Sequence, residues 1–345
     1  MSAGLFSSCV MQSEKFQNTE INYETGMGKI VDILNAYMRA ERAAPVPEAP
    51  LPLRPITREL LASNESQPTV YRLGHSSILI QLDGEYVLTD PVFSERASPV
   101  QWMGPRRFHP VPLSLEELPP LKAVIISHDH YDHLDKASVR ILDEKVEHFI
   151  VPTGVGRYLR DWGVATDKVN ELAWWQSISI GSLQFTATPA QHFSGRGLTD
   201  RDKTLWASWV IVGHDARIFF SGDSGYFAGF QKIGERFGPF DLTLIETGAY
   251  NDLWSEVHMK PEESVQAHLD LRGRAMIPIH NSTFDLALHD WFEPLERAQV
   301  AAEVQGVTLL TPVIGAPVNV RAPVPTQAWW REIIEEGQGE LAAGL

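Results

Sequence analysis

Four side chains that can bind a metal stand within a six-residue stretch, directly after an apolar run. Residues 123–126 are Ala-Val-Ile-Ile, and His128, His130, Asp132 and His133 follow. Imidazole nitrogen and carboxylate oxygen are typical ligands of zinc and similar divalent ions. At this spacing the four cannot share one face of a regular helix, whereas on a loop they can converge on a point. The stretch therefore predicts a metal-binding loop at the C-terminal end of a buried strand.

Three further candidates follow apolar runs later in the chain. His192, Asp223 and His280 each stand where a strand-like segment meets a loop. Side chains at such positions can reach a shared cleft, although each one alone could equally be a capping residue or a satisfied polar residue. Together with the first four they make a larger set than the four ligands of a structural zinc site, which often include Cys, and Cys9 is the chain's only cysteine. The pattern favours a catalytic site with two metals.

The segments around these residues predict two strand-rich halves punctuated by helices. This order favours two packed β-sheets with helices outside. Asp135 is a plausible cap for the helix that follows the metal loop. Strands are expected at 69–73, 76–82, 85–88, 122–126, 149–152, 169–172, 177–180, 183–188, 206–212, 216–220, 242–245, 275–279 and 308–310, and helices at 136–144, 154–162, 227–237, 261–271 and 294–304.

The first part of the chain differs in composition from the rest. Residues 28–42 have apolar residues at helical spacing, and a proline-rich stretch at 45–55 predicts a stiff linker. We therefore divide the chain into an N-terminal extension, residues 1–65, and one main domain, residues 66–345. The extension is expected to run across the surface of the main domain.

Charge and hydropathy exclude some classes of protein. The formal net charge is −15, which disfavours nonspecific nucleic-acid binding. No apolar run approaches the ~18 residues of a transmembrane helix. Residues 5–9 weakly resemble a lipoprotein cleavage box ending at Cys9, but no Lys or Arg precedes it. We expect a cytoplasmic or peripheral membrane protein, with an envelope lipoprotein anchored through Cys9 as the alternative.

The order of the metal motifs resembles that of the metallo-β-lactamase superfamily. Within it, residues 88–99, 102–105 and 234–241 resemble N-acylphosphatidylethanolamine-hydrolysing phospholipase D and its bacterial relatives, in a match that covers roughly residues 70–295. The resemblance implies an α/β fold, a four-layer αββα sandwich with an N-terminal extension. Residues 281–284, Asn-Ser-Thr-Phe, depart from the pattern of the mammalian enzyme, which puts the identity of the substrate in doubt.

The resemblance also divides the seven ligands between two divalent ions, expected to be Zn²⁺ with Fe or Mn as alternatives. It implies that Asp90 orients a ligand His, as a carboxylate near a metal commonly does. Asp129 and Tyr131 are left as spacers inside the loop. The implied ligands of the first ion are His128, His130 and His192. Those of the second ion are Asp132, His133 and His280, and Asp223 is implied to bind both ions.

Four other residues are weaker candidates for the site. His258 precedes a predicted helix N-terminus, where an anion binds readily, and is a candidate catalytic or substrate-contacting residue. His75 lies in a Gly-His turn that matches the family, and we expect it to support the ligands. Arg196 and Tyr250 could meet a charged group of the substrate, with solvated loop positions as the equal alternative.

These residues predict a metal-dependent hydrolase. Two divalent ions supply a hydroxide, positioned by Asp132 and Asp223, that attacks phosphorus or a carbonyl carbon. The favoured reaction is that of a phosphodiesterase of the phospholipase D type, acting on a small-molecule or lipid phosphodiester, with peripheral membrane contact and a homodimer as further expectations. A lactonase or carboxylic-ester hydrolase is the second interpretation, and a noncatalytic metal-binding envelope protein is the third.

Overall fold

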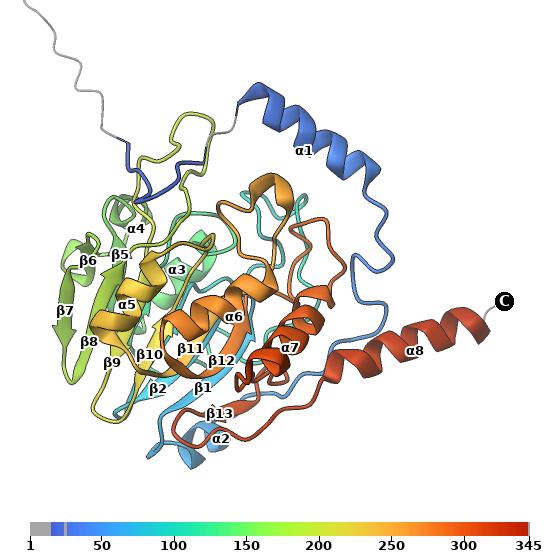
Figure 1. Cartoon of the computed structure of the whole chain (residues 1–345). Coiled ribbons are helices and arrows are strands. Elements are labelled where there is room, and N and C mark those ends of the chain that lie inside the picture. The colour runs from blue at the N-terminus through green and yellow to red at the C-terminus, as the bar shows by residue number, and fades with distance from the viewer. Residues whose placement is uncertain (1–14, 24–25, 344–345) are drawn as a thin grey trace, which may run out of the picture.

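Two mixed β-sheets pack face to face with helices on their outer surfaces, which confirms the predicted αββα sandwich (Figure 1). The computed structural model describes residues 15–23 and 26–343. Cys9, on which the lipoprotein alternative rests, lies outside them. No helix in the described part of the chain has the length and apolar character needed to cross a bilayer.

The first sheet has the strand order β13-β1-β2-β3-β4-β5-β6. Its early strands pair as antiparallel hairpins, whereas β3 to β6 run parallel. The metal loop follows β4, a central strand that is buried almost throughout. The strands are β1 (Thr69–Gly74), β2 (Ser77–Leu82), β3 (Glu85–Thr89), β4 (Leu121–Ile125), β5 (Val146–Pro152), β6 (Val169–Leu172) and β13 (Pro317–Asn319).

The second sheet has the strand order β12-β11-β10-β9-β8-β7. Strands β10, β11 and β12 run parallel, so their C-terminal ends lie at one edge of the sheet. Asp223 follows β10, Glu246 ends β11 and His280 follows β12, and this topology brings the three side chains together. The strands are β7 (Ser177–Ile180), β8 (Leu183–Thr188), β9 (Ser208–Val212), β10 (Arg217–Phe220), β11 (Phe240–Glu246) and β12 (Gly273–Ile279).

Successive side chains of each strand point to opposite faces of the sheet, and this alternation divides the apolar core into layers. In β4, Ala123 and Ile125 pack between the two sheets, and Val124 faces the outer helices together with Ile126. The sequence of a strand that is covered on both faces is typically a continuous apolar run. This explains why the segment before the metal loop has no polar face.

Helices cover both sheets. On the first sheet lie α2 (Arg58–Ser63), α3 (Lys136–Leu142) and α4 (Gly156–Asp161), and on the second lie α5 (Gly229–Phe237), α6 (Pro261–Asp270) and α7 (Glu293–Gln305). Asp135 caps α3 as predicted, because its carboxylate accepts a hydrogen bond of 3.1 Å from the backbone N–H of Ala137.

Near the C-terminus the structure corrects one prediction and shows two elements that were not predicted. Residues 308–310 form no strand, only a single bridge between Leu309 and Met276. Strand β13 was not predicted, because it is three residues long and begins with a proline. Helix α8 (Trp329–Ala343) was also missed, and it is anchored by Trp329 and Trp330, which are buried in one cluster with Trp291.

The N-terminal extension lies on the surface of the sandwich, with helix α1 (Met27–Arg39) above one end of it (Figure 1). The chain then runs along the domain towards α2. Leu51, Ile56 and Leu61 are buried in apolar clusters that also contain residues of the main domain. The later part of the extension therefore contributes to the core.

Candidate metal centre

The seven predicted ligands converge at the edge where the C-terminal ends of the central strands meet. Asp223 lies in the middle, with its Oδ2 atom 3.1 Å from Nε2 of both His133 and His280. The same oxygen is 3.8 Å from Nε2 of His128 and 3.9 Å from Nε2 of His192. Asp223 thus stands between two groups of side chains, and within each group the ligand atoms lie within 4.8 Å of one another. One group consists of His128, His130 and His192, and the other of His75, Asp132, His133 and His280.

Asp90 holds the start of the metal loop. Its carboxylate accepts hydrogen bonds from the backbone N–H of Ser127 at 2.7 Å and from the Ser127 hydroxyl at 2.6 Å. The second of its oxygens lies 2.7 Å from Nδ1 of His133. All three residues are buried. Asp90 therefore fixes both the loop backbone and the orientation of one candidate ligand.

Asp129 is more than the spacer that the sequence predicted. Its carboxylate accepts hydrogen bonds from the backbone N–H of Gly195 at 2.7 Å and from the Thr204 hydroxyl at 2.8 Å. The Tyr158 hydroxyl donates a third, of 3.2 Å. This buried carboxylate ties the metal loop to the loop that follows His192.

Arg196 lies behind the metal loop, which corrects the prediction that it could meet the substrate. Its guanidinium donates to the backbone carbonyls of Asp129 at 2.6 Å and Leu134 at 2.8 Å. It also stacks 3.9 Å above the ring of Tyr131, whose hydroxyl donates to the Arg196 carbonyl. Arg196 and Tyr131 together brace the loop from outside the metal cluster.

Tyr250 is also placed away from the metal cluster. Its hydroxyl donates a 2.7 Å hydrogen bond to Glu293, and its ring stacks on His289 with the centroids 4.5 Å apart. His75 does lie at the site, as expected from the sequence. Its Nε2 atom is 3.0 Å from Asp132 Oδ2, and burial lowers its pKa to about 3. A neutral His75 can donate this hydrogen bond and so position Asp132.

Glu246 is a functional candidate that sequence reasoning missed. It is buried at the end of β11, where its carboxylate contacts Nδ1 of His258 and accepts a hydrogen bond from the backbone N–H of Ser224. The ring of His258 lies 5.1 Å from that of His192 and 5.5 Å from that of His280. The signal in the sequence was a lone Glu directly after the predicted strand 242–245, a setting similar to that of Asp223 and His280.

The electrostatics of the cluster fit a bound cation. Asp223 Oδ1 is buried and has no hydrogen-bond donor among the described residues. Burial alone would lower the pKa of His280, but the carboxylates of Asp223, Asp132 and Glu246 raise it to about 10. Such a negative potential, surrounded by imidazole and carboxylate ligands, is the environment that a divalent cation requires.

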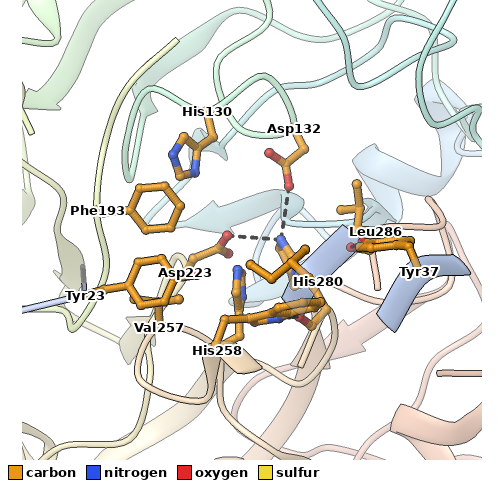
Figure 2. A pocket seen from close by; sticks show the side chains of 13 residues that line it. Tyr23, Tyr37, His130, Asp132, Phe193, Asp223, Val257, His258, His280 and Leu286 are labelled. Carbon is orange, nitrogen blue, oxygen red and sulfur yellow. Dashed lines mark hydrogen bonds and ion pairs between the residues drawn. The ribbon is translucent and has the colours of Figure 1, made fainter. Parts of the chain in front are cut away.

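A cavity of about 270 Å³ opens onto the cluster (Figure 2). One side of the cavity is lined by polar side chains of the cluster, namely His130, Asp132, Asp223, His258 and His280. The remaining walls are largely apolar and aromatic, and they consist of Tyr23, Ile33, Tyr37, Phe193, Ala249, Trp254, Val257 and Leu286.

Residues 85–281 match the family model described as the beta-lactamase superfamily domain. The chain belongs to the metallo-β-lactamase superfamily. Membership, together with the His and Asp cluster, makes it a metal-dependent hydrolase of this superfamily. The predicted resemblance to N-acylphosphatidylethanolamine-hydrolysing phospholipase D is also confirmed by the relatives described next.

An uncharacterised protein of Mycobacterium tuberculosis is 46% identical over 296 residues, which cover 85% of this chain and 79% of that protein. The N-acyl-phosphatidylethanolamine-hydrolyzing phospholipase D 1 of Caenorhabditis elegans is 38% identical over 264 residues, 72% of this chain and 74% of that protein. Among solved structures, a metallo hydrolase from Ignicoccus hospitalis has a TM-score of 0.56 at 21% identity and covers 73% of this chain and 97% of its own. At that identity, the last similarity bears on the fold alone.

Proposed function

We propose that this protein is a phosphodiesterase of the phospholipase D type whose substrate is N-acylphosphatidylethanolamine or a related lipid phosphodiester. The observation that carries the proposal is the position of Asp223, one oxygen of which lies within 3.9 Å of ligand nitrogens from both groups. A pair of divalent ions sharing one site is a recurrent arrangement in phosphoryl-transfer enzymes. The relative from C. elegans, an N-acyl-phosphatidylethanolamine-hydrolyzing phospholipase D, supports the choice of substrate.

The donor set determines which residues would hold the ions. Bound divalent ions lower the pKa of water towards ~7 and stabilise the negative charge that develops on the phosphate. Zinc suits these ligands, and Fe and Mn are the alternatives. Three imidazoles, His128, His130 and His192, would hold one ion, Asp132, His133 and His280 the other, and Asp223 both.

The backbone and the neighbouring carboxylate orient two of these imidazoles. His133 Nδ1 lies 2.7 Å from Asp90, and His192 Nδ1 lies 3.0 Å from the carbonyl oxygen of Val257. An imidazole that donates from Nδ1 presents an unprotonated Nε2 to a metal. Asp90 and Val257 thus set the tautomer that ligation requires.

The residues that face the cavity divide the remaining work. Asp132 and Asp223 accept hydrogen bonds from the attacking water and so fix its position. His258, held at Nδ1 by Glu246, turns its Nε2 towards the phosphate oxygens or the leaving group. The aromatic walls keep other water away, which strengthens each of these electrostatic contacts.

We also propose a peripheral contact with a lipid surface through helix α1. Val31, Leu34 and Met38 expose 49%, 57% and 77% of their surface on one side of this helix. Exposed apolar groups on an amphipathic helix are the usual means of interfacial binding. The same helix reaches the cavity, so a docked protein would receive a lipid substrate directly from the surface.

The test is to incubate the purified full-length protein, with zinc, with N-acylphosphatidylethanolamine in mixed micelles. Cleavage of the phospholipase D type releases an N-acylethanolamine and phosphatidic acid, whereas ester hydrolysis releases a fatty acid. Parallel assays with bis(p-nitrophenyl) phosphate and with lactones identify the class of reaction. Turnover of lactones without turnover of any phosphodiester would reject the proposal.

A further inference from the structure

The N-terminal extension is bonded directly to the backbone of a candidate metal ligand. The Asn18 side-chain amide donates to the carbonyl of His192 at 2.8 Å, and its oxygen accepts from the N–H of His192 at 3.0 Å. The Trp206 indole N–H donates to the same oxygen at 2.9 Å. The position of His192 therefore depends on a residue 174 positions earlier in the chain.

The extension is anchored again on the other side of the cavity. Lys29, in the first turn of α1, forms an ion pair of 3.2 Å with Glu256. The Tyr37 hydroxyl donates to the carbonyl of Leu286 at 3.2 Å, and Arg42 pairs with Asp285. The loops that flank the cavity are thus joined through α1.

Between these anchors, the extension forms part of the cavity wall (Figure 2). Tyr23 contacts Phe193, with ring centroids 5.5 Å apart, and Phe193 in turn lies 4.6 Å from the ring of His130. Tyr37 stacks on Trp254 with the centroids 6.4 Å apart. The wall therefore runs from the extension to His130, a candidate metal ligand, and Ile33 of α1 packs in the same apolar cluster as Tyr23 and Phe193.

The chemistry of this wall specifies what it can hold. Tyr23, Ile33 and Tyr37 come from the extension, and their neighbours Phe193, Trp254 and Leu286 complete a surface without a charged side chain. A hydrophobic wall beside a polar cluster fits an amphipathic molecule whose apolar chain lies next to its anionic group. Burial of such a chain contributes roughly 25 cal/mol per Å² of apolar surface.

We propose that the N-terminal extension is part of the active site, and that Ile33 and Tyr37, with Tyr23, form a subsite for an alkyl or acyl chain attached to the phosphodiester. This inference rests on the proposed function for the phosphodiester, and it goes further in assigning substrate selectivity to residues outside the segment matched by the family model, 85–281. The subsite determines how tightly the chain binds, whereas the metal cluster determines the chemistry.

Helix α1 offers matched controls. Ile33 and Tyr37 line the cavity, whereas Leu34 and Met38, on the same helix, are exposed and line no part of it. Ile33→Ala and Tyr37→Ala test the subsite, and Leu34→Ala and Met38→Ala remove a similar amount of apolar surface without touching it. All four are made in the full-length protein, and circular dichroism checks that each variant folds.

The assay compares two soluble substrates, methyl p-nitrophenyl phosphate and octyl p-nitrophenyl phosphate, both below the concentration at which micelles form. Soluble substrates separate the subsite from binding to a lipid surface. We expect the wild type to prefer the octyl compound, measured as the ratio of kcat/KM for the two substrates. In the Ile33 and Tyr37 variants this ratio should be about tenfold lower, chiefly because the KM for the octyl compound is higher. Cleavage of the methyl compound should change much less than cleavage of the octyl compound in these two variants, and the two controls should behave as the wild type with both substrates.

Calorimetric binding of octyl phosphate and methyl phosphate to the zinc-loaded protein separates this inference from the proposed function. Tighter binding of octyl phosphate that is lost in the Ile33 and Tyr37 variants supports the subsite, even if no phosphodiester is cleaved. Equal affinity for both ligands in the wild type, or equal loss of affinity in the variants and in the controls, would overturn it.

Discussion

Glu246 and His258 share a buried hydrogen bond in the wall of the metal cavity, between the Glu246 carboxylate and His258 Nδ1. Burial and the charge of Asp223 raise the pKa of Glu246 well above its usual value, whereas burial lowers that of His258 to about 4. The geometry leaves the opposite edge of the imidazole towards the cavity. Glu246 is therefore best understood as the residue that positions His258.

Replacing Glu246 tests this relationship. Glu246→Ala should lower kcat about 10–100-fold, the usual cost of losing an orienting partner near a metal, with little change in KM. Glu246→Gln keeps a group that can bond to His258 Nδ1 and should recover most of the activity. Metal content, measured by atomic emission, should stay at the wild-type level in both variants. A variant that loses metal together with activity would instead make Glu246 a ligand.

Asp223 should be indispensable to both metal groups. Asp223→Ala removes the one carboxylate that lies between them, so we expect loss of metal from the protein and a fall in activity of at least about 100-fold. Metal analysis and turnover of bis(p-nitrophenyl) phosphate measure the two effects. Arg196→Ala serves as a comparison, because Arg196 supports the loop without reaching the cluster. Full activity in the Asp223 variant would refute its place at the centre of the site.

The convergence of the metal-cluster side chains could be anticipated from the sequence because each candidate ligand follows an apolar strand, a position that can be recognised locally. The choice of ligand residues remains a prediction, although the structure brings all seven side chains together. Tyr250 and Arg196 were misplaced for a physical reason. The direction of a loop side chain depends on distant partners, such as Glu293 for Tyr250, and no local pattern encodes it.

The fold shows the same division between local and distant information. Periodicity located almost every strand of the sandwich, whereas β13 and α8 depend on packing against β1 and Trp291, far away in the chain. The pairing of Asn18 with His192 joins segments 174 residues apart, so a single sequence could not indicate it. Glu246 was overlooked because one Glu at the end of a strand has many ordinary explanations.

Asn18 should affect metal binding although its side chain lies outside the cluster. Asn18→Ala removes both hydrogen bonds to the backbone of His192, and we expect metal affinity to fall about tenfold, within the range for outer partners of metal ligands. Competition with a chromogenic zinc chelator measures the affinity. Gln17→Ala, one position away and exposed, is the matched control and should bind metal as the wild type does. Equal affinities in the two variants would show that the extension does not support His192.

His268 should make the stability of the fold depend on pH. Its Nδ1 lies 2.8 Å from the Thr243 hydroxyl beneath α6, and burial lowers its pKa to about 4, against ~6.5 in the unfolded chain. The unfolded state therefore binds the proton more tightly, so the stability that a neutral His268 contributes is complete above pH ~6.5 and is lost as the pH falls towards 4.

His268→Gln removes this titration while keeping a polar group near Thr243. Urea unfolding of both proteins at pH 7 and pH 5 gives the comparison. From pH 7 to pH 5, the free energy of unfolding of the wild type should fall by about 2 kcal/mol more than that of the variant, since each pH unit across this window changes it by about 1.4 kcal/mol. Metal loss at low pH affects both proteins and cancels in the difference. A stability difference that is the same at both pH values would mean that His268 does not become protonated on unfolding in this range.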